Sequence, residues 1–137
     1  MTQDRAATAK KKPASRRRNR PAPRQRLLDA ATKLFTEEGI RVIGIDRILR
    51  EADVAKASLY SLLGSKDNLV IAYLQKLDDG YRDRWSERTA AMTDADSKIL
   101  AFFDMAIEEE PAKDFRGSPF VNAATEYPRP ETDSEHN

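Results

Sequence analysis

The stretch from Ile45 to Lys66 constrains the fold of this 137-residue chain more than any other. Its first part places apolar residues three and four positions apart, at Ile45, Ile48, Leu49 and Ala52. This spacing puts them on one face of a helix, so we expect that face to be buried. Residues 53–55 should then form a tight turn, with Val54 buried between two helices.

A second short helix is expected from about Lys56 to Leu62, with Leu59 and Leu63 buried. Gly64 and Ser65 should end this helix, and Ser65 should cap the helix that follows. Two short helices joined by a tight turn are the layout of a helix-turn-helix, in which the N-terminal part of the second helix enters the major groove of DNA.

Residues 24–85 carry a combination of short motifs around this stretch: Arg26-Leu27-Leu28-Asp29-Ala30-Ala31, Leu34-Phe35, Gly39, Ile48, Ala52, Val54, Ser58-Leu59-Tyr60 and Ser65-Lys66-Asp67-Asn68-Leu69. Together they resemble the DNA-binding domain of the TetR (tetracycline-repressor) family of bacterial regulators. A fainter similarity, from Gly117 to Ala124 with Glu126, resembles a segment of the ligand-binding half in one branch of that family.

The helix-turn-helix should be completed by an amphipathic helix from Arg24 to Gly39, and Gly39 is well placed to end it. Its buried face is expected to contain Leu27, Leu28, Ala31, Leu34 and Phe35. Ile40, Val42 and Ile43 should pack the connection. Gly44 takes the N-cap position of the next helix without a side-chain acceptor.

A long helix should run from Ser65 to about Ala90 and connect the two halves of the chain. Another should start at Thr93 or Asp94 and stop at Pro111, with an apolar stripe of Ile99, Phe102, Phe103, Ala106 and Ile107. After a loop from Pro111 to Pro119, residues 120–127 could form one more helix.

These elements predict an all-α fold with a three-helix DNA-binding head, a long connecting helix and a partial helical ligand or dimerisation domain. We expect a disordered basic arm over residues 1–23 and a helix-turn-helix domain over 24–66. An incomplete helical regulatory domain should cover 67–128, and a disordered tail 129–137.

Composition argues against an enzyme. The chain has no cysteine, its one histidine is His136 near the C-terminus, and no glycine-rich phosphate loop is present. We therefore expect no catalytic residue, cofactor or metal. No apolar run approaches the length that spans a membrane, and the basic start is not followed by the apolar segment of a secretory signal, so we expect a cytoplasmic protein.

Charge is distributed unevenly. Residues 1–26 contain ten Lys or Arg and one acidic residue, and the rest contains fourteen Lys or Arg and twenty-two acidic residues. A basic N-terminal part on an acidic body suggests a polyanionic partner for that part. The segment is either a solvated tail or an arm that follows phosphates or enters a minor groove.

The candidate DNA contacts lie on the second helix of the motif and beside it: Arg47, Lys56, Ala57, Ser58, Tyr60, Ser61 and Lys66. Lys56 could donate to guanine in the major groove or contact a phosphate. Ser58 could bind DNA or cap its own helix, and the resemblance implies a phosphate contact for Tyr60, which could instead be a core aromatic. Lys66 opposes the dipole of the long helix, which a nearby phosphate would explain.

Two positions depart from the family pattern. Asp53 replaces the glycine often found in the turn, although Asp tolerates the left-handed conformation better than most residues. Ala55 replaces the common Ser or Thr, so the second helix should lack its usual cap, at a cost of roughly 1 kcal/mol. Asp46, Glu51 and Asp53 also place negative charge near the DNA face.

The second half carries the residues that could line an apolar effector pocket, as the resemblance implies: Tyr81, Trp85, Phe102, Phe103, Met105 and Phe120. They are more readily explained as core residues or as an exposed patch, because family members typically continue with further helices. Either the chain is a shortened family member, or it dimerises through the long helix and the stripe from Ile99 to Ile107.

The leading hypothesis is a transcriptional regulator, most simply a ligand-responsive repressor that binds a palindromic double-stranded operator as a homodimer and responds to a small apolar effector. The alternative is a shortened helical interaction module that associates with a longer homologue and inhibits it.

Overall fold

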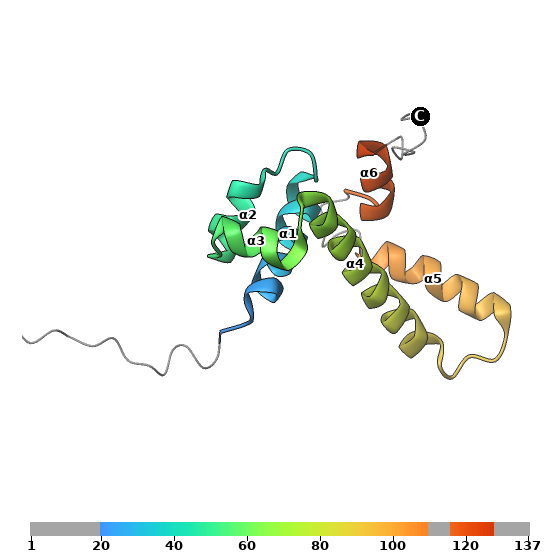
Figure 1. Ribbon diagram of the computed structural model, residues 1–137. Helices are drawn as coiled ribbons and strands as arrows, with labels where there is room; N and C mark the ends of the chain where they lie inside the picture. Colours follow the sequence, from blue (N-terminus) through green and yellow to red (C-terminus); the bar gives the residue numbers. More distant parts are fainter. Residues whose placement is uncertain (1–19, 110–115, 128–137) are drawn as a thin grey trace, which may run out of the picture.

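A computed structural model describes residues 20–109 and 116–127, and these residues form helices without any strand. Figure 1 shows the helices in order: α1 (Pro23–Glu38), α2 (Ile45–Ala52), α3 (Lys56–Leu63), α4 (Lys66–Thr89), α5 (Ala95–Glu109) and α6 (Pro119–Glu126). The all-α prediction is therefore confirmed. The predicted arm up to residue 19, the predicted stop at Pro111 and the predicted C-terminal tail from 129 lie outside the described residues.

Helix α1 begins and ends as its sequence predicts. Pro23 occupies the first helical position, where a missing N–H costs nothing. Gly39 follows the last turn with a φ of 101°, and its N–H donates to the carbonyl of Phe35. A φ in this range favours glycine, so the expected end of the helix is confirmed.

The turn between α2 and α3 depends on Asp53, which adopts the left-handed conformation with φ 51° and ψ 57°. Arg26 of α1 supports this turn, since its guanidinium donates to the carbonyls of Ala52 and Asp53 at 2.9 Å each. These carbonyls lie at the C-terminal end of α2, where a cation also suits the helix dipole.

One hydrophobic core unites α1, α2, α3 and the first half of α4. Leu27, Ile48, Leu59 and Leu69, one from each helix, are fully buried within it. Tyr73 of α4 is 1% exposed and packs edge-on against Phe35, with ring centroids 5.4 Å apart. The helix-turn-helix is thus held by α1 on one side and by α4 on the other.

Val42 corrects the prediction for the connection between α1 and α2. Ile40 and Ile43 are buried as expected, whereas Val42 is 72% exposed. Residues 40–42 form a turn without a regular side-chain period, and this turn buries two of the three apolar side chains of the connection and leaves Val42 in solvent.

Helix α4 starts at the predicted cap, because the hydroxyl of Ser65 accepts the N–H of Asn68 at 3.1 Å. It extends away from the head, and α5 runs back beside its second half (Figure 1). Ala101 and Met105 are the buried residues of α5. Four members of the predicted stripe, Ile99, Phe102, Phe103 and Ile107, are instead 55–69% exposed.

Helix α6 packs on the head and not on the exposed stripe of α5. Its Ala123 is 6% exposed and belongs to the same core as α1, α2 and α3. Helix α6 therefore adds to the core of the head, although it lies in the second half of the sequence.

Leu59→Ala should destabilise the head strongly, because Leu59 is fully buried and its truncation leaves a cavity. We expect a loss of about 2–5 kcal/mol in the free energy of unfolding, measured by urea denaturation followed by circular dichroism. Leu62→Ala is the matched control, since Leu62 lies on the same helix but is 43% exposed. Equal losses for the two variants would contradict this assignment of the buried face.

Candidate nucleic-acid interface

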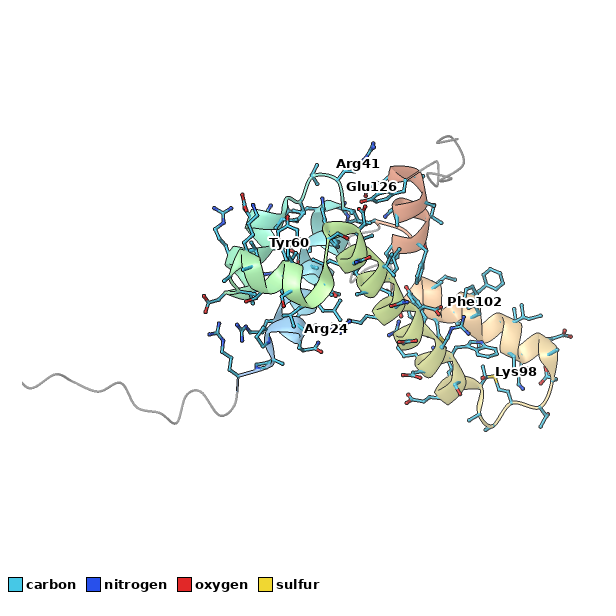
Figure 2. All side chains as sticks on the ribbon, viewed as in Figure 1. Arg24, Arg41, Tyr60, Lys98, Phe102 and Glu126 are labelled. Carbon is cyan, nitrogen blue, oxygen red and sulfur yellow. The ribbon has the colours of Figure 1, made fainter. Side chains whose placement is uncertain are left out.

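The outer face of α3 carries most of the residues predicted to contact DNA. Lys56, Ala57, Tyr60 and Ser61 are exposed and Ser58 is half-buried, while Leu59 anchors the opposite side in the core. Tyr60 is 46% exposed on this outer face (Figure 2). The alternative that Tyr60 is a core aromatic is therefore not the arrangement found.

The start of α3 is uncapped by any side chain, as expected from Ala55 at its N-cap. Ser58 donates its backbone N–H to the carbonyl of Ala55 at 3.0 Å. Ala57 and Ser58 give the first turn two small side chains, which leave room for the close approach of a DNA backbone.

Arg47 already has an acidic partner within the chain. Its guanidinium donates to both carboxylate oxygens of Glu38, at 2.6 and 2.5 Å. Hydrogen bonding to Arg47 lowers the pKa of Glu38, and hydrogen bonding to Glu38 raises the pKa of Arg47. Both side chains remain exposed, so this pair is screened by solvent and a phosphate contact by Arg47 stays a prediction.

Lys66 also has an internal role that the sequence did not reveal. Its ammonium donates to the carbonyl of Ile40 at 2.9 Å, which joins the start of α4 to the connection between α1 and α2. This hydrogen bond offers a second explanation for a cation at the start of a helix. A phosphate contact by Lys66 stays a prediction.

Two of the three acidic residues near α3 have basic partners. Glu51 accepts from Lys33 at 2.9 Å, and Asp53 accepts from the guanidinium of Arg20. The hydrogen bond from Arg20 holds the pKa of Asp53 below its usual value. Arg20 and Arg26 were not among the predicted site residues, although Arg26 opens the family motif.

The six residues predicted to line an effector pocket do not gather in one place. Tyr81, Trp85, Phe102 and Met105 line an open cavity of about 300 Å³ between α4 and α5. Phe103 is not part of this cavity and contacts Phe102 edge-on, with ring centroids 5.8 Å apart. Phe120 is not part of this cavity either and packs against Tyr81, with ring centroids 6.0 Å apart.

A larger cavity of about 500 Å³ lies where α6 meets the head. Its lining includes Phe35, Ile40, Tyr73, Arg116 and Glu126. The sequence reasoning missed this cavity, because it is formed by segments that lie far apart in the sequence.

Within residues 20–109 and 116–127, His, Cys, Asp and Glu side chains do not gather in a group of three that could hold a metal ion. None of the helices in this part of the chain combines the length and apolarity needed to cross a membrane.

Comparison with known proteins places this geometry in a family. Residues 27–73, which span most of α1, all of α2 and α3 and the start of α4, match the model of bacterial regulatory proteins of the tetR family. The chain is 30% identical over 105 residues to the HTH-type transcriptional regulator LmrA of Bacillus subtilis (strain 168), covering 75% of this chain and 56% of LmrA.

A second curated relative is the HTH-type transcriptional regulator HbdR of Aromatoleum sp. (strain CIB), 33% identical over 70 residues, with 51% of this chain and 31% of HbdR covered. The fold also matches the crystal structure of SCO4454, a TetR-family transcriptional regulator from Streptomyces coelicolor. The TM-score is 0.73 at 39% identity, and the match covers 81% of this chain and 59% of that one.

The chain thus spans less than two thirds of each of these relatives. The family match nevertheless falls on the segment whose geometry is described above, and the likeness to SCO4454 extends beyond it into the second half. On this evidence, the chain is a member of the TetR family of bacterial transcriptional regulators.

Proposed function

We propose that this chain binds double-stranded DNA sequence-specifically through the outer face of α3 and acts as a repressor. The observation that carries the proposal is the arrangement of α3, which Leu59 fastens to the core while Lys56, Tyr60 and Ser61 face solvent. Major-groove recognition by a helix-turn-helix requires this arrangement, in which the buried side positions the helix and the exposed side reads base edges.

Roles follow from the chemistry of each side chain. Lys56 is proposed to contact a base edge or a phosphate, and Ala57 and Ser58 to permit close approach of the backbone. Tyr60 and Ser61 are proposed to donate to phosphates, with Arg47 and Lys66 as further phosphate contacts. A phosphate would compete with the carboxylate of Glu38 for Arg47, and with the carbonyl of Ile40 for Lys66.

Repression is proposed to occur by occlusion, with two copies of α3 in successive major grooves of a palindromic operator. Such half-sites lie about one helical turn apart, roughly 34–36 Å, or a near multiple of it. For this function we propose three parts of the chain: a basic arm (1–23), a DNA-binding head (24–66) and a regulatory part (67–128). Helix α6 belongs to the regulatory part in sequence but packs on the head.

A small apolar effector is proposed to bind between α4 and α5. The cavity there has mainly apolar walls, formed by Tyr81, Trp85, Phe102 and Met105. An effector in it would change the position of α4, whose first half is part of the head core. Because α4 belongs to both halves, its displacement would alter the spacing of paired heads.

The homodimer that reads a palindrome is proposed to form through the exposed apolar face of α5, which contains Ile99, Leu100, Phe102, Phe103 and Ile107. Each of these side chains leaves on the order of 100 Å² uncovered, so two copies would bury about 1,000 Å², near the lower limit for a specific interface. We propose a second copy of this chain as the partner for this face, because binding to a palindromic operator requires two copies related by a two-fold axis.

The alternative function is association with a longer homologue, whose DNA binding this chain would inhibit. One observation supports it: the apolar face of α5, which includes Phe102 and Phe103, has no covering element among the described residues. This alternative predicts weak DNA binding by the isolated chain and a stable complex with the longer relative.

Lys56→Ala should weaken binding to the preferred DNA fragment or relax its base preference, by about 1–3 kcal/mol if the contact is to a base edge. Binding is measured by fluorescence anisotropy against preferred and scrambled duplexes. Lys98→Ala makes the same charge change on α5, remote from α3, and should bind as the parent does. Loss of equal size in both variants would argue against a specific role for Lys56.

Deletion of residues 1–19 removes seven Lys or Arg and leaves every described residue in place. The plot of log affinity against log salt concentration should become shallower by about 0.9 for each phosphate that the segment no longer neutralises. A variant of parental length with Lys10–Lys12 and Arg16–Arg18 changed to Ser separates charge from length. An unchanged slope in both would make the segment a passive tail.

Phe103→Asp should convert a dimer to a monomer, because it places a charge in the centre of the proposed interface. Sedimentation equilibrium at micromolar concentration measures the change. Val42→Asp is the control, since Val42 is also an exposed apolar residue but is located on the head. A monomeric parent, or a Phe103→Asp variant that remains dimeric, would refute this interface.

A further inference from the structure

Helix α6 is joined to the head by a carboxylate. Both oxygens of Glu126, the last residue of α6, accept backbone N–H groups: that of Ile40 at 3.1 Å and that of Arg41. Figure 2 shows Glu126 and Arg41 beside each other, at the connection between α1 and α2. Hydrogen bonds to an ionised acceptor are among the stronger ones in proteins.

Gly39 precedes the two N–H groups that Glu126 binds. Its φ of 101° turns the chain away from α1 and leaves these N–H groups outside any helix. A Cβ at position 39 would lie 3.4 Å from a carboxylate oxygen of Glu126, which is an ordinary contact, so it is the backbone conformation that favours glycine there. The glycine therefore ends α1 and leaves the N–H groups of Ile40 and Arg41 free to donate to Glu126.

The same connection is held from its other side by α4. The carbonyl of Ile40 accepts the ammonium of Lys66, and the side chain of Ile40 is 3% exposed. Lys66 is the first residue of α4 and follows Gly64, which ends α3, by two positions. A continuous set of hydrogen bonds thus runs from Glu126 through Ile40 to the segment at the C-terminal end of α3.

A second contact holds the other end of α6. The guanidinium of Arg116 donates to the carbonyl of Glu37, in the last turn of α1, and the amide of Asn122 donates to the carbonyl of Arg116 at 2.9 Å. A cation at this position also suits the negative end of the α1 dipole. Together with buried Ala123, these contacts attach α6 to the head at three points.

From these contacts we propose that α6 is a docking helix for the DNA-binding head, and that Glu126 is a positioning residue for α3. By holding the backbone of Ile40 and Arg41, Glu126 fixes the connection that sets α2 against α1, and through Lys66 it fixes the end of α3. The positioning role rests on the proposed DNA binding. The docking itself does not.

This proposal gives a role to the segment from Gly117 to Glu126, whose sequence resembles part of a ligand-binding half. Its consequence for regulation is direct, because the cavity of about 500 Å³ at the junction includes Ile40, Arg116 and Glu126 in its lining. Any change at this junction reaches the connection between α1 and α2 without passing through the second half of α4.

Amide hydrogen exchange tests the docking contact without DNA. In Glu126→Ala, the amides of Ile40 and Arg41 should exchange about tenfold faster or more, since each loses a charge-assisted hydrogen bond. In Glu126→Gln, one terminal oxygen becomes an NH₂ donor that faces a backbone N–H, so one of the two amides should still be affected. Glu87→Gln, on the exposed surface of α4, is the matched control and should leave both amides unchanged.

DNA affinity of the same variants tests the positioning role. Measured well below the melting temperature of each variant, the affinity of Glu126→Ala should be about three- to tenfold weaker than that of the parent, with Glu87→Gln unchanged. Unchanged exchange at Ile40 and Arg41 overturns the docking contact. Faster exchange with unchanged DNA affinity overturns the positioning role and leaves a purely structural one. A parent chain that binds no DNA overturns the proposed function and the positioning role with it, whereas the exchange rates still decide the docking.

Discussion

The burial of Leu59 is the interaction on which the rest of the head depends. Helix α3 has eight residues and no side-chain cap, and a helix of that length is not stable alone in water. It exists because Leu59, fully buried, packs in the core that α1, α2 and α4 share. Leu59, with the half-buried Leu63 beside it, also decides which face of α3 remains in solvent, and therefore which residues are available to a partner.

Local sequence signals predicted this part of the fold well. Periodicity identified Leu59 and Ile48 as buried, and the Ser65 cap and Gly39 end follow from the chemistry of single residues. Signals of this kind act within one turn of helix, so they can be read without tertiary information. The exposed side of α3 follows from the same pattern, which is why the sequence could identify the candidate residues there.

Contacts between distant segments could not be predicted in this way. Arg47 and Lys66 were predicted only as DNA contacts, but Arg47 also pairs with Glu38, and Lys66 donates to the carbonyl of Ile40. The apolar residues of α5 share a face as predicted, but this face is exposed. Periodicity predicts which residues share a face and does not predict which element covers that face. The prediction for Val42 failed for a related reason, since an irregular connection has no period from which its orientation follows.

The resulting picture is a helix-turn-helix held by α1 and α4, with the segment around α6 attached to α1 and to the connection between α1 and α2. The contacts of α1 and α4 are mainly apolar, whereas Glu126 of α6 and Arg116, which precedes α6, bind backbone groups of the head. Apolar contacts supply most of the stability, and the polar ones fix orientation because their geometry is directional. A DNA-binding regulator needs both kinds of contact, since the helix that contacts DNA must be stable and also correctly oriented.

Recognition of a DNA sequence by the outer face of α3 decides the function proposed for this chain. It can be measured by selecting bound fragments from sheared genomic DNA with the purified chain and then footprinting the enriched fragments. We predict a protected palindrome whose half-sites are centred about one helical turn apart, roughly 34–36 Å, or a near multiple of it. Fragments enriched no more than the salt-sensitive background would contradict sequence-specific recognition by α3.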